Sequence, residues 1–341
     1  MKIAILGVGS WGTALSIVLS ENQHDVIMWG REEPIVRSIN EEHSNSQYLA
    51  NVALPPNLEA TSDLSLALQD AEMVVFAVPS QAIREVAEKI KGDLSEATIK
   101  PLIVHVAKGI ERETYLRLSE VIAEVLPSDL HRGIVVLSGP SHAEEVARRD
   151  LTTITAASES LQSAREVQEA FMNSYFRVYT NDDVVGVELG GALKNIIAVC
   201  AGVLVGLNYG DNAKAALMTR GLAEITRLGV KMGADPLTFS GLAGVGDLIV
   251  TCTSVHSRNW RAGNLLAQGY TLPEIEEKIG MVIEGFITVQ VAYNLAQQMG
   301  VEMPITEMLY HYLYEDLDVT INEAIQTLMD REGKKEASLK Q

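Results

Sequence analysis

The pattern of apolar residues changes near residue 181, and this change constrains the fold more than any other feature of the chain. Before it, short apolar runs alternate with stretches whose apolar residues recur every three or four positions. Such alternation is typical of parallel strands joined by crossover helices. After residue 182 only helical patterns follow. We predict an α/β domain with a doubly wound, largely parallel sheet over residues 1–181, followed by an all-helical domain over 182–332.

The expected elements follow from the same periodicity. The first domain is predicted to hold helices at 82–91, 115–126 and 161–171, and strands at 2–6, 25–29, 73–77, 102–107, 134–137, 152–156 and 177–179. The second is predicted to hold helices, bounded by glycines and prolines, at 184–207, 212–232, 259–268, 272–279, 286–298, 305–314 and 321–330. Residues 333–341 are polar and lack apolar periodicity, which predicts a frayed tail.

The charge balance narrows the range of partners. The chain has 45 Asp and Glu against 27 Lys and Arg, for a formal net charge of -18. Nucleic acids and anionic membranes attract proteins rich in Lys and Arg. We therefore expect neither partner. The longest apolar stretch, residues 196–207, is shorter than the roughly 20 residues that span a bilayer. We expect no membrane insertion and a cytoplasmic location.

The cysteines and histidines do not follow a metal-binding pattern. Cys200 and Cys252 are far apart, and the seven histidines lack ligand spacing. We predict no metal site and no disulfide framework, which fits a reducing compartment. Cys252 lies in an apolar run and is expected in the core rather than as a nucleophile.

A glycine-rich turn follows the first predicted strand and opens a predicted helix. Gly7, Gly9 and Gly12 have the spacing G-x-G-x-x-G. The first glycine permits a tight turn, the second admits a pyrophosphate close to the backbone, and the third allows close helix packing, while the helix N-terminus offers free N–H groups. This context predicts a dinucleotide site.

The end of the second predicted strand bears on which dinucleotide binds. An acid there would bind a ribose 2′-hydroxyl, whereas an arginine would accommodate a 2′-phosphate. The residue present is Arg31, followed by Glu32 and Glu33. We favour NADPH, with NADH also compatible. The alternative is that Arg31 is a solvated loop cation.

Two lysines stand in unusual places. Lys108 follows a buried strand, close to the small turn 138–144, and open α/β sheets bind ligands at such strand ends. Lys194 lies beside Asn195 within an apolar helical pattern. Burial and a neighbouring cation lower the pKa of a lysine toward neutrality, which suits proton exchange near pH 7. The alternatives are a surface cation for Lys108 and an acid-paired lysine at the domain junction for Lys194.

A third cluster lies in residues 241–259. It combines glycines and hydroxyl residues with Asp247, then Ser257 as a helix N-cap followed by Arg258 and Asn259. A cation beside the free N–H groups of a helix start makes an anion site. The alternative is a flexible loop with a capped helix. His142 and His256 lie in these loops, and we expect them to be exposed or outside direct ligand contact.

Together, and in order, these segments resemble the bacterial-type NAD(P)-dependent glycerol-3-phosphate dehydrogenases. The similar segments are GVGSWGTAL, AVPSQAIREV, AKGIE, LSGPSHAEEV, ELGGALKNIIAVCAGV, TRGLAEITRLG, GLAGVGDLIVTCTSVHSRN and VIEGF. The resemblance implies a Rossmann-type domain, a helical domain and an active site between them. It also implies the interconversion of dihydroxyacetone phosphate and sn-glycerol 3-phosphate for glycerophospholipid synthesis, and a homodimer.

The resemblance also implies roles for individual residues. Lys194 matches the proton donor and acceptor, Lys108 a residue that touches substrate and cofactor, and Asp247 an active-site acid. The implied substrate contacts are Lys108, Lys194, Asp247, Gly139, Ser141, Ser257, Arg258 and Asn259, with Asn195 and Thr251 as weaker matches. The implied cofactor contacts, besides the three glycines and Lys108, are Ser10, Trp11, Arg31, Ala143, Arg258, Val282 and Glu284, with Tyr48 as a weaker match.

Two other functions remain open. A 3-hydroxyacid or 6-phosphogluconate dehydrogenase would have a similar architecture but a substrate with a carboxylate, whereas the adjacent Lys194 and Asn195 favour the glycerol phosphate pattern. A non-catalytic dinucleotide sensor would need the glycine turn but neither the two lysines nor Asp247. If Arg31, Lys108, Lys194 and Arg258 line one cleft, a positive pocket lies within a negative surface.

Overall fold

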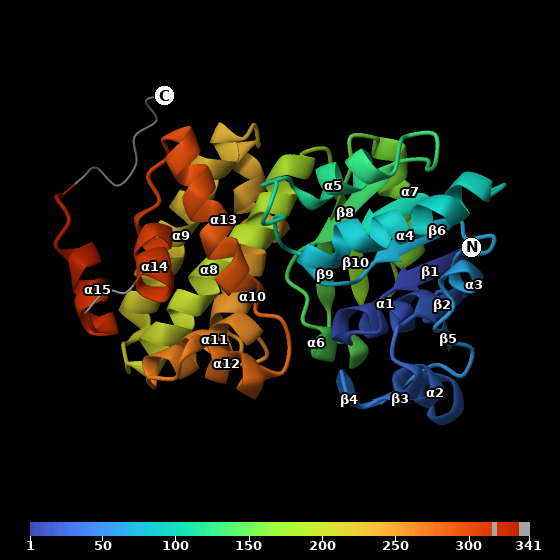
Figure 1. Ribbon diagram of the computed structural model, residues 1–341, viewed down its shortest axis with the longest axis horizontal. Helices are drawn as coiled ribbons and strands as arrows, with labels where there is room; N and C mark the ends of the chain where they lie inside the picture. Colours follow the sequence, from blue (N-terminus) through green and yellow to red (C-terminus); the bar gives the residue numbers. More distant parts are fainter. Residues whose placement is uncertain (316–318, 334–341) are drawn as a thin grey trace.

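The computed structural model describes residues 1–315 and 319–333. It consists of a sheet covered by helices in the N-terminal half and a helical body in the C-terminal half, which lie side by side (Figure 1). The predicted fold class is confirmed. Of the predicted polar tail, residues 334–341 lie outside the described residues.

The main sheet has eight strands in the order β10-β9-β8-β7-β6-β1-β2-β5. Neighbouring strands are parallel except for β8 and β9, which are antiparallel. The sheet is therefore largely parallel, as predicted. Its strands are β1 (Lys2–Leu6), β2 (Asp25–Trp29), β5 (Glu59–Thr61), β6 (Met73–Phe76), β7 (Leu102–His105), β8 (Ile134–Ser138), β9 (Thr152–Ala157) and β10 (Phe176–Asn181).

Helices cover both faces of this sheet because alternate strand residues point to opposite sides. Ile3 and Ile5 pack in the layer with α1 (Ser10–Glu21), α2 (Glu33–Glu42), α6 (Ala143–Ala147) and α7 (Leu161–Phe171). Ala4 and Leu6 pack in the other layer with α3 (Leu64–Leu68), α4 (Ile83–Glu96) and α5 (Leu118–Val125). Strands buried on both faces explain the continuous apolar runs in the sequence.

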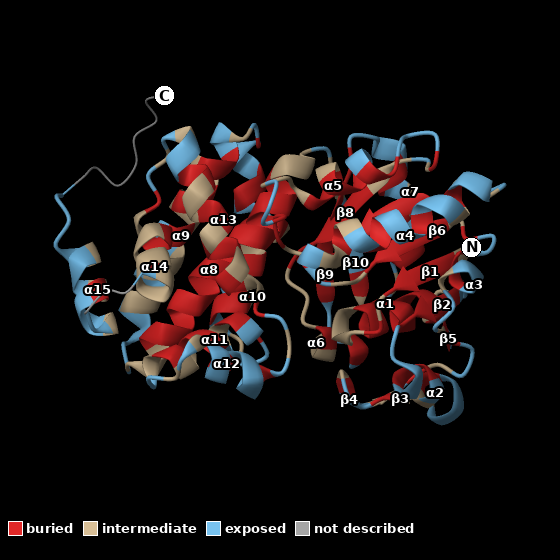
Figure 2. Cartoon of the chain, in the orientation of Figure 1, coloured by how far each residue is buried: buried red, intermediate tan, exposed pale blue. Residues whose placement is uncertain are grey.

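The C-terminal body is built around α8 (Val184–Gly206), which is buried along most of its length (Figure 2). Glycines bring its backbone close to the next layer. A Cβ on Gly202 would lie 1.9 Å from the carbonyl oxygen of Trp260, and one on Gly263 would lie 1.9 Å from that of Val199. The surrounding helices are α9 (Asp211–Lys231), α10 (Asp247–Thr253), α11 (Arg258–Ala267), α12 (Leu272–Ile279), α13 (Glu284–Met299), α14 (Pro304–Tyr314) and α15 (Ile321–Met329).

Helix α8 is longer than the apolar stretch 196–207 from which its length was judged. Among the described residues, α8 alone is long and apolar enough to cross a membrane, so the expectation that no segment reaches that length was wrong. Helix α8 is instead a core helix, since 89% of its most apolar window is buried inside the protein.

Several short elements were not predicted. They are β5, α2, α3, α6, α10, the two-stranded sheet of β3 (Ser44–Asn45) and β4 (Leu49–Ala53), and the helical turns Ser80–Ala82, Pro236–Ser240 and Leu242–Gly246. Most are too short to show a periodic apolar pattern. Helix α10 directly follows a glycine-rich turn, which reads as a loop in sequence. The predicted helix 115–126 begins only at Leu118, since Tyr115 has a positive φ of 61°.

Candidate active site

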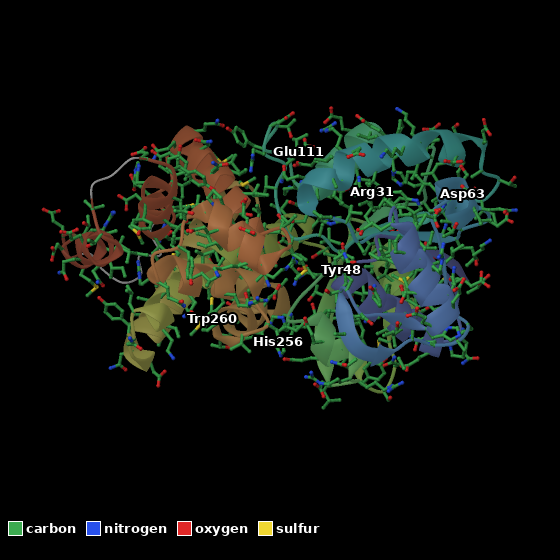
Figure 3. The ribbon with its side chains drawn as sticks, turned by 60° about the horizontal axis from the view of Figure 1, so that its bottom comes forward. Arg31, Tyr48, Asp63, Glu111, His256 and Trp260 are labelled. Atoms are coloured by element: carbon green, nitrogen blue, oxygen red, sulfur yellow. The ribbon has the colours of Figure 1, made fainter. Side chains whose placement is uncertain are left out.

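A cleft of about 1030 Å³ lies between the sheet domain and the helical body. Its walls come from the turn after β1, the carboxyl ends of β6 and β7, the turn before α6, and residues of α8, α10, α11 and α13. Figure 3 shows Tyr48 on the sheet side of this junction and His256 on the helical side. The cleft thus joins the segments that carried the sequence motifs.

Most residues singled out from the sequence line this cleft. They are Gly7, Gly9, Ser10, Trp11, Arg31, Tyr48, Lys108, Ser141, Ala143, Lys194, Asn195, Asp247, Thr251, Ser257, Arg258, Asn259, Val282 and Glu284. Arg31, Lys108, Lys194 and Arg258 are among them, so the anticipated local group of cations exists. Gly12 and Gly139 are not part of the lining.

The glycine turn fits the phosphates of a dinucleotide. Gly7 has a φ of +129°, and a Cβ there would lie 2.5 Å from the carbonyl oxygen of Ala77. A Cβ on Gly12 would lie 2.3 Å from the carbonyl oxygen of Gly7, so Gly12 serves the packing of the turn. Gly9 faces open space and precedes α1, whose N-terminus has no side-chain cap. Its uncapped N–H groups and positive dipole end suit an anion.

Tyr48 connects the turn before α1 to the end of β2. The Ser10 hydroxyl donates a 2.5 Å hydrogen bond to the carbonyl oxygen of Tyr48, whose own hydroxyl donates to Glu32 Oε1 at 3.2 Å. Burial and the Glu32 carboxylate raise the pKa of Tyr48. Glu32 therefore has a protein partner, while the neighbouring Arg31 is exposed at the cleft.

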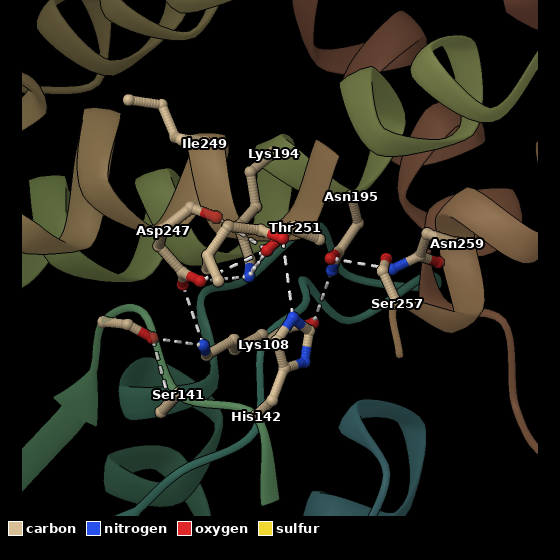
Figure 4. Close-up of polar contacts among 12 residues, drawn as sticks. Lys108, Ser141, His142, Lys194, Asn195, Asp247, Ile249, Thr251, Ser257 and Asn259 are labelled. Carbon is tan, nitrogen blue, oxygen red and sulfur yellow. Dashed lines mark hydrogen bonds and ion pairs between the residues drawn. The ribbon is translucent and has the colours of Figure 1, made fainter. Parts of the chain in front are cut away.

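At the centre of the cleft, Asp247 binds two lysines (Figure 4). Its Oδ1 accepts a hydrogen bond from Lys194 Nζ, and its Oδ2 accepts one from Lys108 Nζ at 2.8 Å. Lys194 also donates to the Thr251 hydroxyl at 2.5 Å, and Thr251 donates to the carbonyl oxygen of Asp247 at 2.6 Å. Lys108 donates to the carbonyl oxygen of Gly139 at 2.9 Å. The acid and both lysines are thus held in one network.

Burial and neighbouring charges shift the pKa values of Lys194 and Asp247. Burial lowers the pKa of Lys194 to about 7; Asp247 opposes this change and Lys108 adds to it. Burial by itself would raise the pKa of Asp247, but the two ammonium groups outweigh it and the pKa is lowered. Asp247 is therefore a carboxylate beside a lysine that exchanges its proton near neutral pH.

A chain of amides ties three helices together next to the lysines. Asn195 Nδ2 donates to the carbonyl oxygen of Lys108 at 3.4 Å, and Asn259 Nδ2 donates to Asn195 Oδ1 at 2.9 Å. Asn259 Oδ1 accepts from the N–H of Gly285 at 2.9 Å. The amide oxygens of both asparagines are thus used within the protein, and each side chain keeps one N–H beyond these bonds.

The start of α11 combines a cation with a capped helix end. Ser257 is its N-cap, as predicted, and its Oγ accepts from the N–H of Trp260 at 3.2 Å. The Arg258 guanidinium is exposed to the cleft and donates to the carbonyl oxygen of Val282 at 3.0 Å. A positive side chain beside a helix N-terminus suits a phosphate.

Glu284, at the start of α13, connects the helical body to the sheet domain. Its carboxylate accepts hydrogen bonds from the N–H and the hydroxyl of Ser80, at 3.0 and 2.6 Å. Burial raises the pKa of Glu284. Ser80 carried no sequence signal that singled it out.

Gly139 acts through its backbone. Its φ is +150°, and a Cβ there would lie 2.9 Å from Cα of Ile154. Its carbonyl oxygen accepts from Lys108 and, at 2.9 Å, from the Ser141 hydroxyl.

Two histidines lie at the cleft: His256 is exposed, as expected, whereas His142 is partly buried. His142 and His256 both line the cleft, and their ring centroids lie 5.9 Å apart. Burial and the charge of Lys194 lower the pKa of His142. The position of His142 in the small turn after β8 was the sequence signal that it lies at the cleft.

Cys252 is buried in the core, as expected. Within residues 1–315 and 319–333, no group of three or more His, Cys, Asp or Glu could hold a metal.

Comparison with known proteins decides the family. Residues 2–164 match the NAD-dependent glycerol-3-phosphate dehydrogenase N-terminus, and residues 183–325 match the C-terminus of the same enzyme family. The chain belongs to the NAD-dependent glycerol-3-phosphate dehydrogenase family. The resemblance inferred from the motifs is thereby confirmed, as is the prediction of an NAD(P)-dependent oxidoreductase.

Relatives of this dehydrogenase cover nearly its whole length. It is 60% identical over 335 residues to glycerol-3-phosphate dehydrogenase [NAD(P)+] of Enterococcus faecalis, a match covering 98% of this chain and 97% of the relative. The corresponding protein of Bacillus pumilus is 57% identical over 330 residues, covering 97% of this chain and 94% of the relative.

Solved structures agree with this assignment. The crystal structure of glycerol-3-phosphate dehydrogenase from Coxiella burnetii superposes with a TM-score of 0.89 at 40% identity, covering 96% of this chain and 98% of that one. A ketopantoate reductase from Ralstonia eutropha has a TM-score of 0.60 at 15% identity, covering 92% of this chain and 97% of that one, and shares the fold alone.

Proposed function

We propose that this dehydrogenase interconverts dihydroxyacetone phosphate and sn-glycerol 3-phosphate in the cleft between its two halves, with Lys194 as the proton donor and acceptor. The observation that carries this proposal is the buried Lys194, whose pKa of about 7 accompanies its contacts with Asp247 and Thr251. A general acid and base is most effective when its pKa lies near the working pH.

The two reaction directions need opposite protonation states of Lys194. A bound nicotinamide would supply or accept the hydride. In reduction, Lys194 as ammonium donates a proton from Nζ to the oxygen of the former ketone. In oxidation, the neutral amine takes the proton of the substrate hydroxyl. A lysine with an ordinary pKa of about 10.4 would almost never be neutral at pH 7.

Asp247, Thr251 and Lys108 prepare Lys194 for this role. Asp247 and Thr251 orient Nζ, and Lys108 adds positive charge that makes the loss of a proton easier. Lys108 is itself anchored on Asp247 and Gly139, so its ammonium faces the same region. We propose that Lys108 also touches both substrate and cofactor.

The substrate phosphate would bind at the start of α11. Arg258 supplies the charge, and the helix N-terminus capped by Ser257 adds N–H groups and a positive dipole end. Asn259 and Asn195 each retain an amide N–H beyond their bonds within the protein. Ser141 and Gly139 complete the proposed substrate contacts.

The cofactor would lie along the sheet side of the cleft and reach the start of α13 on the helical side. Its pyrophosphate fits the turn of Gly7, Gly9 and Gly12, and Ser10, Trp11, Tyr48, Ala143, Val282 and Glu284 are further proposed contacts. We propose a preference for NADPH, because Arg31 is exposed at the end of β2 while the adjacent Glu32 accepts a hydrogen bond from Tyr48.

The wider proposals rest on the family resemblance and on charge. We propose a homodimer, a cytoplasmic location, and a role in supplying glycerol 3-phosphate for glycerophospholipid synthesis. We also propose that residues 1–181 and 182–332 are separate domains. A net charge of -18 is unsuited to nucleic acid or anionic membranes.

A substrate comparison tests the proposed reaction. NADPH oxidation is measured with dihydroxyacetone phosphate and, separately, with a ketone that carries a carboxylate instead of the phosphate. We expect turnover with the first and little with the second. A preference for the carboxylate would instead support a hydroxyacid dehydrogenase, and no turnover with either would support a dinucleotide sensor.

A further inference from the structure

A second buried ionic cluster lies behind the active site, where α8 meets the sheet domain. Its centre is Glu188 of α8, whose side chain is 3% exposed. Glu188 Oε1 accepts from the N–H of Ser119 at 2.8 Å and lies 3.1 Å from His105 Nε2. Its Oε2 accepts from the Ser119 hydroxyl at 2.6 Å and from Arg117 Nη1 at 2.6 Å. Both carboxylate oxygens are therefore occupied by groups of the sheet domain.

Burial of the Glu188 carboxylate carries a desolvation cost that its partners must offset. By itself, burial would raise the pKa of Glu188, but His105, Arg117 and Ser119 outweigh it and the pKa is lowered. The carboxylate is thus charged, and a buried charge that loses a partner is strongly destabilising. Any placement of α8 that separates Glu188 from these partners is therefore disfavoured. Buried ionic groups of this kind can set the register of packed elements.

The same two chain segments carry the lysines of the cleft. Glu188 precedes Lys194 by six residues on one helix, or about 9 Å along its axis. His105 ends β7, three residues before Lys108. Gly191 lies between Glu188 and Lys194 on α8. A Cβ on Gly191 would lie 2.8 Å from Ser138 Oγ and 3.5 Å from Lys108 Cγ, so the helix backbone packs directly against the sheet domain.

We propose that Glu188 is a positioning residue for the reaction. Through His105, Arg117 and Ser119 it sets where α8 lies against β7, so that Nζ of Lys194 meets Asp247 and the substrate oxygen. Glu188 touches neither substrate nor cofactor and does not line the cleft. This inference rests on the proposed role of Lys194.

The decisive variant is Glu188→Gln. It keeps the shape of the side chain but removes the charge and turns an N–H donor toward donors of the cluster. A misplacement of about 1 Å in a reacting group can cost on the order of 100-fold in rate. We expect kcat to fall at least about tenfold, the Kd for NADPH to stay within about twofold, and the solvent deuterium isotope effect on kcat to rise, since proton transfer from Lys194 becomes slower.

Glu224→Gln is the matched control. Glu224 is also buried, but it lies on α9 and accepts from the N–H groups of Ile305 and Thr306 at the start of α14, at 2.7 and 3.2 Å. We expect this variant to lower Tm without changing kcat or the isotope effect. Ser119→Ala is a milder second variant, which removes one hydroxyl contact with Glu188 and keeps the test usable if Glu188→Gln folds poorly. We expect it to lower kcat, but by less than Glu188→Gln.

The outcomes separate the two proposals. If Glu188→Gln and Ser119→Ala lower Tm but leave kcat and the isotope effect at wild-type values, Glu188 is structural only and the positioning role is wrong. Lys194→Ala is measured in parallel. If that variant keeps normal kcat, the proposed function of Lys194 fails instead.

Discussion

Lys194 and Asp247 form a buried ion pair between α8 and α10, and the other oxygen of Asp247 binds Lys108 of the sheet domain at 2.8 Å. One carboxylate thus holds two ammonium groups that come from the two halves of the chain. Each lysine disfavours the charge of the other, while Asp247 favours both. The proton affinity of Lys194 therefore depends on how the two halves pack.

Loss of Lys194 should remove proton transfer and leave cofactor binding intact. In Lys194→Ala we expect kcat to fall by about 10² to 10⁴ in both directions, the usual contribution of a general acid or base. The Kd for NADPH, measured by fluorescence titration, should stay within about twofold. Lys214→Ala is the control, because Lys214 pairs with the exposed Asp211 away from the cleft. A near-normal kcat would contradict the role of Lys194.

The two reaction directions should have opposite pH dependence. The pKa of Lys194 is lowered to about 7, so the ammonium predominates below that pH and the amine above it. Reduction needs the ammonium, and its single-turnover rate should fall as pH rises through about 7. Oxidation needs the amine, and its rate should rise over the same range. Profiles that run in parallel would rule out one group serving both directions.

Asp247→Asn should shift these profiles toward acid. The Asp247 carboxylate raises the pKa of Lys194, and its loss leaves burial and Lys108, which both lower that pKa. We expect the midpoint for reduction to move below its wild-type value and kcat for reduction at pH 7.5 to fall. A pH series on both proteins measures the shift. A midpoint that moves toward alkali would show that Asp247 does not stabilise the charged lysine.

Arg31→Asp should change cofactor preference. If the guanidinium faces a 2′-phosphate, its replacement by an acid should weaken NADPH at least about tenfold, because a charged hydrogen bond becomes a repulsion. The Kd for NADH should change by no more than about threefold. Arg37→Asp makes the same change in net charge on the exposed side of α2, outside the cleft. Equal losses for both cofactors would place Arg31 away from the 2′-phosphate.

Arg258→Ala should affect phosphorylated substrates selectively. We expect kcat/KM for dihydroxyacetone phosphate to fall by about 100-fold, in line with the loss of a charge-assisted contact. Dihydroxyacetone, which has no phosphate, serves as the comparison substrate, and its low kcat/KM should change little. A similar loss for both substrates would argue that Arg258 maintains the cleft or contacts the cofactor rather than binding the substrate phosphate.

Local chemistry allowed much of the fold to be predicted. The glycine turn before α1, the buried strands and the long C-terminal helices follow from backbone freedom and apolar periodicity, which neighbouring residues determine. Short elements such as β3, β4 and α10 escaped because they span too few residues to show a period. Lys108, Lys194 and Asp247 could be singled out as unusual residues, and Ser257 as a helix cap.

Residues that are neighbours along the chain specify the local motifs, and with them the fold class and the family. The packing of distant segments specifies which charges meet. Lys194 lies 53 residues from Asp247, Lys108 lies 139 residues from it, and Glu284 lies 204 residues from Ser80. No local pattern encodes such pairs, since helix packing brings them together. Burial then sets their pKa values, because only a folded chain removes the water that otherwise screens each charge.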